Sequence, residues 1–106
     1  MKLLTKEIRK MLPTLGSQSN CEFGNSIAYV KFFTPWSYWT WYAMEFDGED
    51  IFYGYVRGVE CEFGTFSLSE LKSINGLFGL KVERDKYFKP TKISELIKKH
   101  EIRGEV

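Results

Sequence analysis

The sequence has few of the residues, and none of the motifs, from which most catalytic and metal sites are built. Its 106 residues include one histidine, His100, and two cysteines, Cys21 and Cys61. Two cysteines so far apart make neither a disulfide framework nor a CxxC redox pair, so we expect both to be reduced and partly buried. The GxSxG, GxGxxG and P-loop patterns do not occur, and no Ser or Cys motif lies near the histidine. We therefore expect no enzyme, no cofactor and no metal site.

The sequence also lacks a long apolar run and a strong net charge. The chain opens Met1-Lys2-Leu3-Leu4 and is charged again from Lys6 and Glu7, which leaves no stretch long enough for a signal peptide or a membrane helix. We expect a cytoplasmic protein with no membrane partner. Fifteen Lys plus Arg against fourteen Asp plus Glu give a net charge of +1, without the signature of a nucleic-acid binder. Basic residues gather at the two ends and acidic residues in 45–62, a distribution typical of solvated faces.

Length and composition allow one domain over residues 1–106, because a chain of this size with 43% hydrophobic residues buries a single core. Local patterns predict an α+β fold: an antiparallel sheet of about four strands with an aromatic central hairpin, flanked by two or three short helices. The expected strands are 27–33, 38–46, 49–57 and 59–66, with a short one at 80–83. The expected helices are 6–12, capped by Thr5 and closed by Pro13, then 67–75, ended by Asn75-Gly76, and 92–100, capped by Thr91.

Asp47-Gly48, between two aromatic and β-branched runs, is the strongest hairpin signal in the chain. A two-residue turn would place Trp41 opposite Gly54 and Ala43 opposite Phe52. A four-residue turn would shift this register by two and leave the faces unchanged. Alternation along the first strand divides its side chains between two faces. One face carries Trp39, Trp41 and Ala43, and the other Thr40, Tyr42, Met44 and Phe46.

Ser67 and Glu70 have the spacing of a capping box. The Ser67 side chain would accept from the Glu70 amide, and the Glu70 carboxylate would accept from the Ser67 amide. Phe66 and Leu71 are spaced to form the accompanying hydrophobic staple. In the last helix one apolar face is expected. Its members are Ile93, Leu96, Ile97 and His100.

Twelve of the eighteen aromatic residues fall between Tyr29 and Tyr55. Aromatic residues in strands are first of all packing residues. Because both faces of the hairpin are apolar, either helices or oligomer partners cover both, or one face is an open platform that stacks nucleobases or receives a protein. Trp36 and Tyr38 follow Pro35 outside the strand register, so we expect them to be the most exposed for binding.

Segments spread along the chain form a combined pattern. They are Lys2-Leu3-Leu4-Thr5, Lys31-Phe32-Phe33-Thr34-Pro35, Trp39-Thr40-Trp41-Tyr42-Ala43, 45–50, 66–71 and Glu83-Arg84-Asp85. With this pattern the chain resembles, over nearly its whole length, a family of small bacterial proteins known as domain of unknown function 2958. The resemblance implies no activity and no catalytic residues. It implies a setting, because such proteins are typically encoded on plasmids, phages and integrative elements beside replication, transfer and anti-restriction genes.

From this setting we expect a non-enzymatic counter-defence protein that binds and disables a host nuclease or its guide RNA complex. A CRISPR effector, and hence an anti-CRISPR role, ranks ahead of a restriction enzyme. An inhibitor of this kind would use the acidic stretch as a phosphate mimic in a nucleic-acid channel. The residues expected to bind the partner are Trp36, Tyr38, Glu45, Asp47, Glu49, Asp50, Glu60 and Glu62.

Two alternatives stay open at this point. The first is a binder of single-stranded DNA or RNA, in which rings stack on bases while cations, including the basic tail, contact phosphates. Its candidate residues are Tyr29, Lys31, Trp39, Trp41, Tyr53 and Arg57. The second is a metal-dependent nuclease that uses the acidic residues, since hard cations prefer carboxylate oxygens. Alternation in the hairpin would scatter these carboxylates over two faces, and the sequence leaves the oligomeric state open.

Overall fold

Five antiparallel strands form the main sheet of the computed structural model, which describes residues 2–22 and 24–104 and the side chains up to Lys99. Across the sheet they lie in the order β5 (Cys61–Ser67), β4 (Ile51–Arg57), β3 (Thr40–Phe46), β2 (Val30–Phe33) and β6 (Glu83–Arg84). A separate two-stranded sheet pairs β1 (Ile27–Ala28) with β7 (Thr91–Lys92). The α+β fold expected from the sequence is confirmed, with five strands in the main sheet rather than four.

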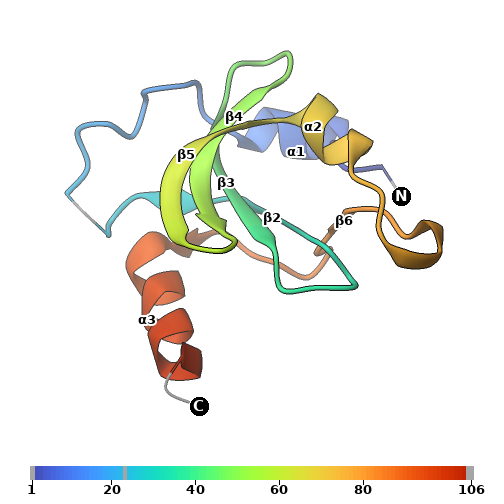
Figure 1. The fold of residues 1–106 in the computed structure, drawn as a ribbon. Coiled ribbons are helices and arrows are strands. Elements are labelled where there is room, and N and C mark those ends of the chain that lie inside the picture. The colour runs from blue at the N-terminus through green and yellow to red at the C-terminus, as the bar shows by residue number, and fades with distance from the viewer. Residues whose placement is uncertain (1, 23, 105–106) are drawn as a thin grey trace.

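The helices cover both faces of this sheet (Figure 1). On one face α1 (Lys6–Met11) and α2 (Leu68–Ser73) pack with the core that contains Phe32, Trp41 and Phe52. On the other face α3 (Ile93–Gly104) packs through Ile93 and Leu96 against a smaller core. That core contains Ala28, Tyr42, Met44 and Tyr55. The chain itself therefore covers both apolar faces of the hairpin.

Side-chain caps begin α1 and α2 where the sequence predicts. Thr5 accepts a hydrogen bond from the amide of Ile8 at 3.2 Å, and Ser67 accepts from the amide of Glu70 at 3.0 Å. The second half of the capping box differs from the expectation. The Glu70 carboxylate accepts from the Ser67 hydroxyl at 3.2 Å and not from its amide. Ser67 is at the same time the last residue of β5. Phe66 and Leu71 of the predicted staple are both buried in the same core.

The register of the central hairpin corrects two predictions. Phe46 pairs with Phe52, so the β3–β4 loop is longer than two residues. Further from the loop Ala43 pairs with Gly54, as the four-residue turn predicts. A β-bulge at Met44 separates the two registers. The extra residue turns Phe46 onto the face of Trp41 and Ala43, so its predicted place on the opposite face is wrong.

Other boundaries shift because long-range pairing competes with local signals. The expected strand 27–33 is divided at Tyr29, and its first half leaves the main sheet to pair with β7. Thr91 is a β7 residue whose hydroxyl donates to the Lys89 carbonyl, so α3 begins at Ile93 without the predicted cap. Of the expected strand 80–83 only Glu83 lies in a strand, because β6 spans Glu83–Arg84.

Three smaller expectations concern single residues. Gly76 does not end α2 in a left-handed turn, because the helix stops at Ser73 and Gly76 has φ −101°. Cys21 and Cys61 are free thiols, but both are exposed rather than partly buried. The side chain of His100 lies outside the described residues, whereas the other members of its predicted face, Ile93, Leu96 and Ile97, do pack together.

Candidate partner-binding site

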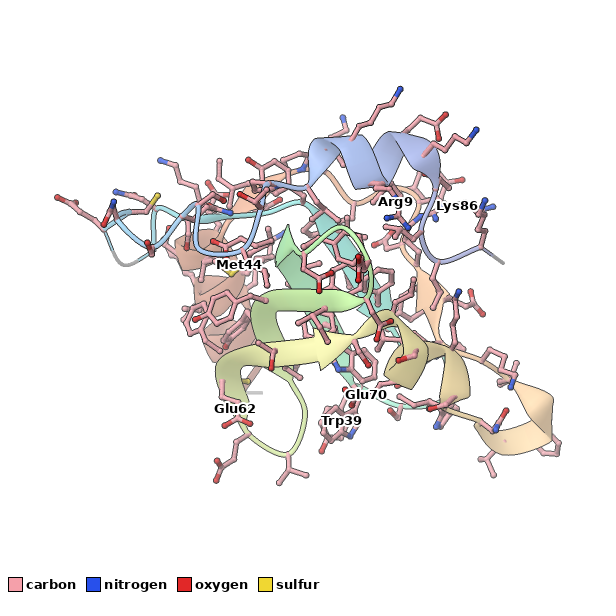
Figure 2. All side chains as sticks on the ribbon, turned by 90° about the horizontal axis from the view of Figure 1, so that it is seen from above. Arg9, Trp39, Met44, Glu62, Glu70 and Lys86 are labelled. Atoms are coloured by element: carbon pink, nitrogen blue, oxygen red, sulfur yellow. The ribbon has the colours of Figure 1, made fainter. Side chains whose placement is uncertain are left out.

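The residues expected to bind a partner lie at opposite ends of the main sheet. The loop before β3 carries Trp36 and Tyr38, and the turn after β4 carries Glu60 and leads to Glu62. These meet at one end, because the first residue of β3 pairs with the last residue of β4. Figure 2 shows Trp39 and Glu62 on this side of the molecule. The remaining carboxylates lie at or beside the β3–β4 loop, at the other end: Glu45, Asp47, Glu49 and Asp50.

Glu45 has a structural role inside the protein. Its side chain is 4% exposed, and its two oxygens accept from the amides of Gly16 at 2.7 Å and Gln18 at 2.9 Å. The Gln18 side chain continues the network, because its amide group donates to the carbonyls of Ile27 and Met44, each at 3.1 Å. The carboxylate thus fixes the loop around Gly16 and Gln18 beside the sheet and is not available as a phosphate mimic.

Asp47 and Asp50 also bind their own chain. One Asp47 oxygen accepts from the amides of Glu49, Asp50 and Ile51 at 2.8–3.0 Å, and these bonds hold the pKa of the carboxyl below its ordinary value of 3.8. The Asp50 carboxylate accepts from the amide and the hydroxyl of Ser69 at 2.9 and 2.8 Å, which ties the loop to the start of α2. Of the carboxylates at this end only Glu49 is exposed and makes no such bond in the described structure.

Among residues 2–22 and 24–99, whose side chains the structure describes, no group of three or more His, Cys, Asp or Glu residues could hold a metal ion. The predicted acidic set is divided between the two ends of the sheet, and three of its carboxylates are used in loop contacts. This part of the chain therefore offers the nuclease alternative no metal centre.

At the opposite end, two tryptophan rings lie on glycines and hold three loops together. A Cβ added to Gly76 would lie 2.3–2.4 Å from atoms of the Trp36 ring, and a Cβ added to Gly58 would lie 2.3 Å from the Trp39 ring. The first contact joins the loop 34–39 to the α2–β6 connection, and the second joins it to the β4–β5 turn. Trp36 is consequently half-buried, contrary to the expectation that it is freely exposed, whereas Tyr38 is 55% exposed.

The three joined loops expose several large apolar side chains, which we call the apolar ridge. Its members are Tyr38, Trp39, Val59, Leu77 and Phe78. Phe78 is 97% exposed and has φ +57°, the one positive φ among the described non-glycine residues. Two backbone hydrogen bonds, from Gly76 to Leu80 at 2.8 Å and from Leu80 to Leu77 at 3.1 Å, close the turn that carries it. Clusters of exposed apolar side chains of this kind mark interaction sites more often than isolated ones do.

The residues of the nucleic-acid alternative do not form a shared stacking face. Trp41 is 7% exposed and belongs to the core under α1 and α2, where Tyr29 also packs. Tyr53 packs on the other side of the sheet with the core under α3. Arg57 is half-buried at the end of β4, and Lys31 on β2 forms an ion pair with Asp85 at 3.8 Å. Of the four rings only Trp39 is classed among the exposed large side chains, at 36%.

Val59, Leu77 and Phe78 are ridge residues that the sequence reasoning missed. The segment Gly76-Leu77-Phe78-Gly79 places two large apolar residues between two glycines, which is unusual in a turn. That pattern could have marked an exposed apolar turn, whereas the reasoning above treated Asn75-Gly76 only as the end of a helix.

Residues 3–106 match the family described as "Protein of unknown function (DUF2958)", and the chain belongs to that family. No curated protein and no solved structure matches the chain. None of the helices in the described part of the chain is long and apolar enough to cross a membrane.

Proposed function

We propose that this protein acts without catalysis, by binding another protein through the apolar ridge. The observation that carries the proposal is the gathering of five exposed large apolar side chains on three loops that two tryptophans hold together. Aromatic side chains on a pre-organised surface are the usual centres of binding energy at protein interfaces, because they bury a large area and lose little conformational freedom. The exposed carboxylates of Glu60 and Glu62 lie at the same end of the sheet and would form a polar rim.

The proposed partner is a defence nuclease of the bacterial host, with a CRISPR effector ahead of a restriction enzyme. The support is associational: the resemblance to proteins encoded on mobile elements and the absence of catalytic motifs. A nuclease presents a basic channel to nucleic acid, and Glu60 and Glu62 suit such a surface next to an apolar contact. Glu45, Asp47 and Asp50 bind their own chain, so of the predicted carboxylates we assign the role of phosphate mimic only to Glu60 and Glu62.

A plasmid interference assay tests the proposal. Expression of the protein in a host with an active CRISPR or restriction system should restore transformation by a targeted plasmid, and pull-down from that host should recover the nuclease. Phe78→Gly should abolish both effects without unfolding the protein, because glycine adopts a positive φ without strain. Met11→Ala, at an exposed apolar residue on α1, should leave both effects unchanged.

The two parts of the proposal fail differently. If the unaltered protein protects no plasmid against the defence systems of its hosts, the nuclease is the wrong partner. If it protects but Phe78→Gly protects equally well, the ridge is the wrong surface.

Binding of single-stranded DNA or RNA stays the second candidate. It is favoured by a cleft that three lysines line, Lys31, Lys89 and Lys99. Gel shifts with labelled oligonucleotides at low and moderate salt would test it.

A further inference from the structure

A cleft of about 330 Å³ lies on the α3 side of the molecule, between β2, the β6–β7 connection and α3. Small-ligand sites occupy roughly 300–1,000 Å³, so the cleft has room for one small ligand. Three lysines from three separate elements line it, together with aromatic rings. Lys31 comes from β2, Lys89 from the β6–β7 connection and Lys99 from α3.

The charges in this cleft are unbalanced. Asp85 is the one carboxylate that lines it, and it forms an ion pair with Lys31 at 3.8 Å. Within the described residues Lys89 and Lys99 form no ion pair. Three ammonium groups around one concavity repel each other and raise the local concentration of anions. A bound anion between them would relieve the repulsion.

An exposed ring stands beside these lysines on an ordered turn. Tyr87 is 92% exposed and lines the cleft. Its amide donates to the Asp85 carboxylate at 2.9 Å, and the amide of Phe88 donates to the Asp85 carbonyl at 3.3 Å. The Phe88 ring in turn packs against Tyr42, with centroids 5.7 Å apart. The turn therefore holds the backbone of Tyr87 in place while its ring faces solvent, the arrangement by which proteins stack a nucleobase.

We propose that this cleft binds a nucleotide, with its phosphate on Lys89 and Lys99 and its base on Tyr87. The proposal is independent of the apolar ridge, and it deepens the second candidate function by assigning it a ligand class and a site. A phosphate suits the two lysines because hydrogen bonds between an ammonium group and a phosphate are stronger than those between neutral groups. A base suits Tyr87 because every nucleobase has a face that can stack on an aromatic ring. Asp85 disfavours an anion close to Lys31, which places the phosphate nearer to Lys89 and Lys99. The nucleotide could be free or part of a single strand.

Nuclear magnetic resonance titrations of the ¹⁵N-labelled protein at low salt can test this site. The probes are adenosine 5′-monophosphate, inorganic phosphate and an oligothymidylate of about ten nucleotides, a length within the usual site size for single strands. The mononucleotide should cause saturable shifts of the amide signals of residues 85–91 and bind about tenfold more tightly than inorganic phosphate. An oligothymidylate affinity at least tenfold above that of the mononucleotide would identify single strands as the source of the ligand. Equal affinities would identify the free nucleotide.

Matched variants separate a built site from diffuse positive charge. Lys89→Ala and Lys99→Ala should each weaken mononucleotide binding about tenfold, the effect of losing one charged hydrogen bond. Lys86→Ala and Lys98→Ala remove exposed lysines that are neighbours in sequence but do not line the cleft, and should change affinity less than about twofold. Tyr87→Ala should reduce mononucleotide affinity to that of inorganic phosphate.

Three results would overturn the nucleotide site. The first is the absence of saturable shifts at residues 85–91 with the mononucleotide. The second is an equal loss of affinity in all four lysine variants, which would mean a diffuse effect of charge. The third is equal affinity for inorganic phosphate and mononucleotide in the unaltered protein, which would mean that Tyr87 does not recognise a base.

Discussion

Replacing Gly54 by alanine should destabilise the protein strongly, whereas the same change at Gly64 should not. The two glycines pair with each other across β4 and β5, but Gly54 is buried in an interior strand and Gly64 is half-buried in an edge strand. A Cβ added at Gly54 would lie 1.9 Å from the Tyr42 carbonyl oxygen and 3.2 Å from the Ala43 Cα. A Cβ added at Gly64 would have no atom within 4 Å.

The contact at Gly54 is with backbone, so no change of side-chain rotamer can relieve it. Because Cβ contacts below 3.0 Å are essentially never found, the added Cβ and the Tyr42 carbonyl oxygen must move apart by at least 1.1 Å, the difference between 3.0 and 1.9 Å, which displaces the β3 backbone from β4. Separation weakens ladder hydrogen bonds worth about 1 kcal/mol each and disturbs packing at a further cost of about 1–3 kcal/mol. We expect a total loss of about 3–5 kcal/mol, against a domain stability of about 5–15 kcal/mol.

Urea titrations followed by tryptophan fluorescence measure the difference between the two variants. Each replacement lowers the conformational entropy of the unfolded chain, which by itself stabilises the protein by about 0.4–1 kcal/mol. This contribution cancels when the two variants are compared. Gly64→Ala should keep or slightly raise the midpoint, whereas Gly54→Ala should lower it by about 2 M or prevent folding. Midpoints within about 0.5 M of each other would refute the reasoning, because the two strands could not then approach as closely as described.

Two further predictions concern the caps and loops. Ser67→Ala should destabilise the protein by about 1 kcal/mol, because the Glu70 amide loses its acceptor. Glu70→Ala should cost less, and the double variant should be less than additive in urea titrations. An unchanged midpoint for Ser67→Ala would contradict the cap. The lowered pKa of Asp47 stabilises the fold above about pH 4, and this contribution is lost as pH falls through the folded-state pKa. The midpoint difference between the protein and Asp47→Asn should therefore shrink below that pH, and a constant difference from pH 6 to 2.5 would contradict the prediction.

The elements that local sequence specifies were predictable. Thr5 and Ser67 cap their helices as predicted, because the residues that a cap needs lie within one turn. Thr91 does not, because its pairing in β7 competes with the local signal. The hairpin around Asp47-Gly48 was equally accessible, since alternation on both sides of a turn signal is a local pattern. The length of its loop was not. Asp47 accepts from three successive amides, and this geometry needs more residues than a two-residue turn contains.

The β-bulge at Met44 could not be read from the sequence, yet it determines much of the candidate site. No local signal marks a bulge in a run of apolar residues, because its position depends on how the partner strand pairs. Its presence places Phe46 in the core and leaves Glu45 where its carboxylate accepts from the amides of Gly16 and Gln18. Glu45 received a partner-binding role from the sequence only as a member of the acidic stretch 45–62, a pattern that contains no information about its burial. The same argument applies to Trp36, whose burial depends on Gly76, forty residues away.

Phe78 is the residue for which the fold supplies no reason. A non-glycine residue in the left-handed region costs about 1 kcal/mol, and neighbouring Gly79 shows that glycine already serves such a backbone in this turn. Burial could offset this cost, but the Phe78 side chain is 97% exposed and packs on nothing in the described chain. A residue that breaks a local conformational preference without stabilising its own domain is expected to have a role in binding or function. Since the strain and the exposure coincide at this one ridge residue, the contact that compensates Phe78 is best sought in a partner protein.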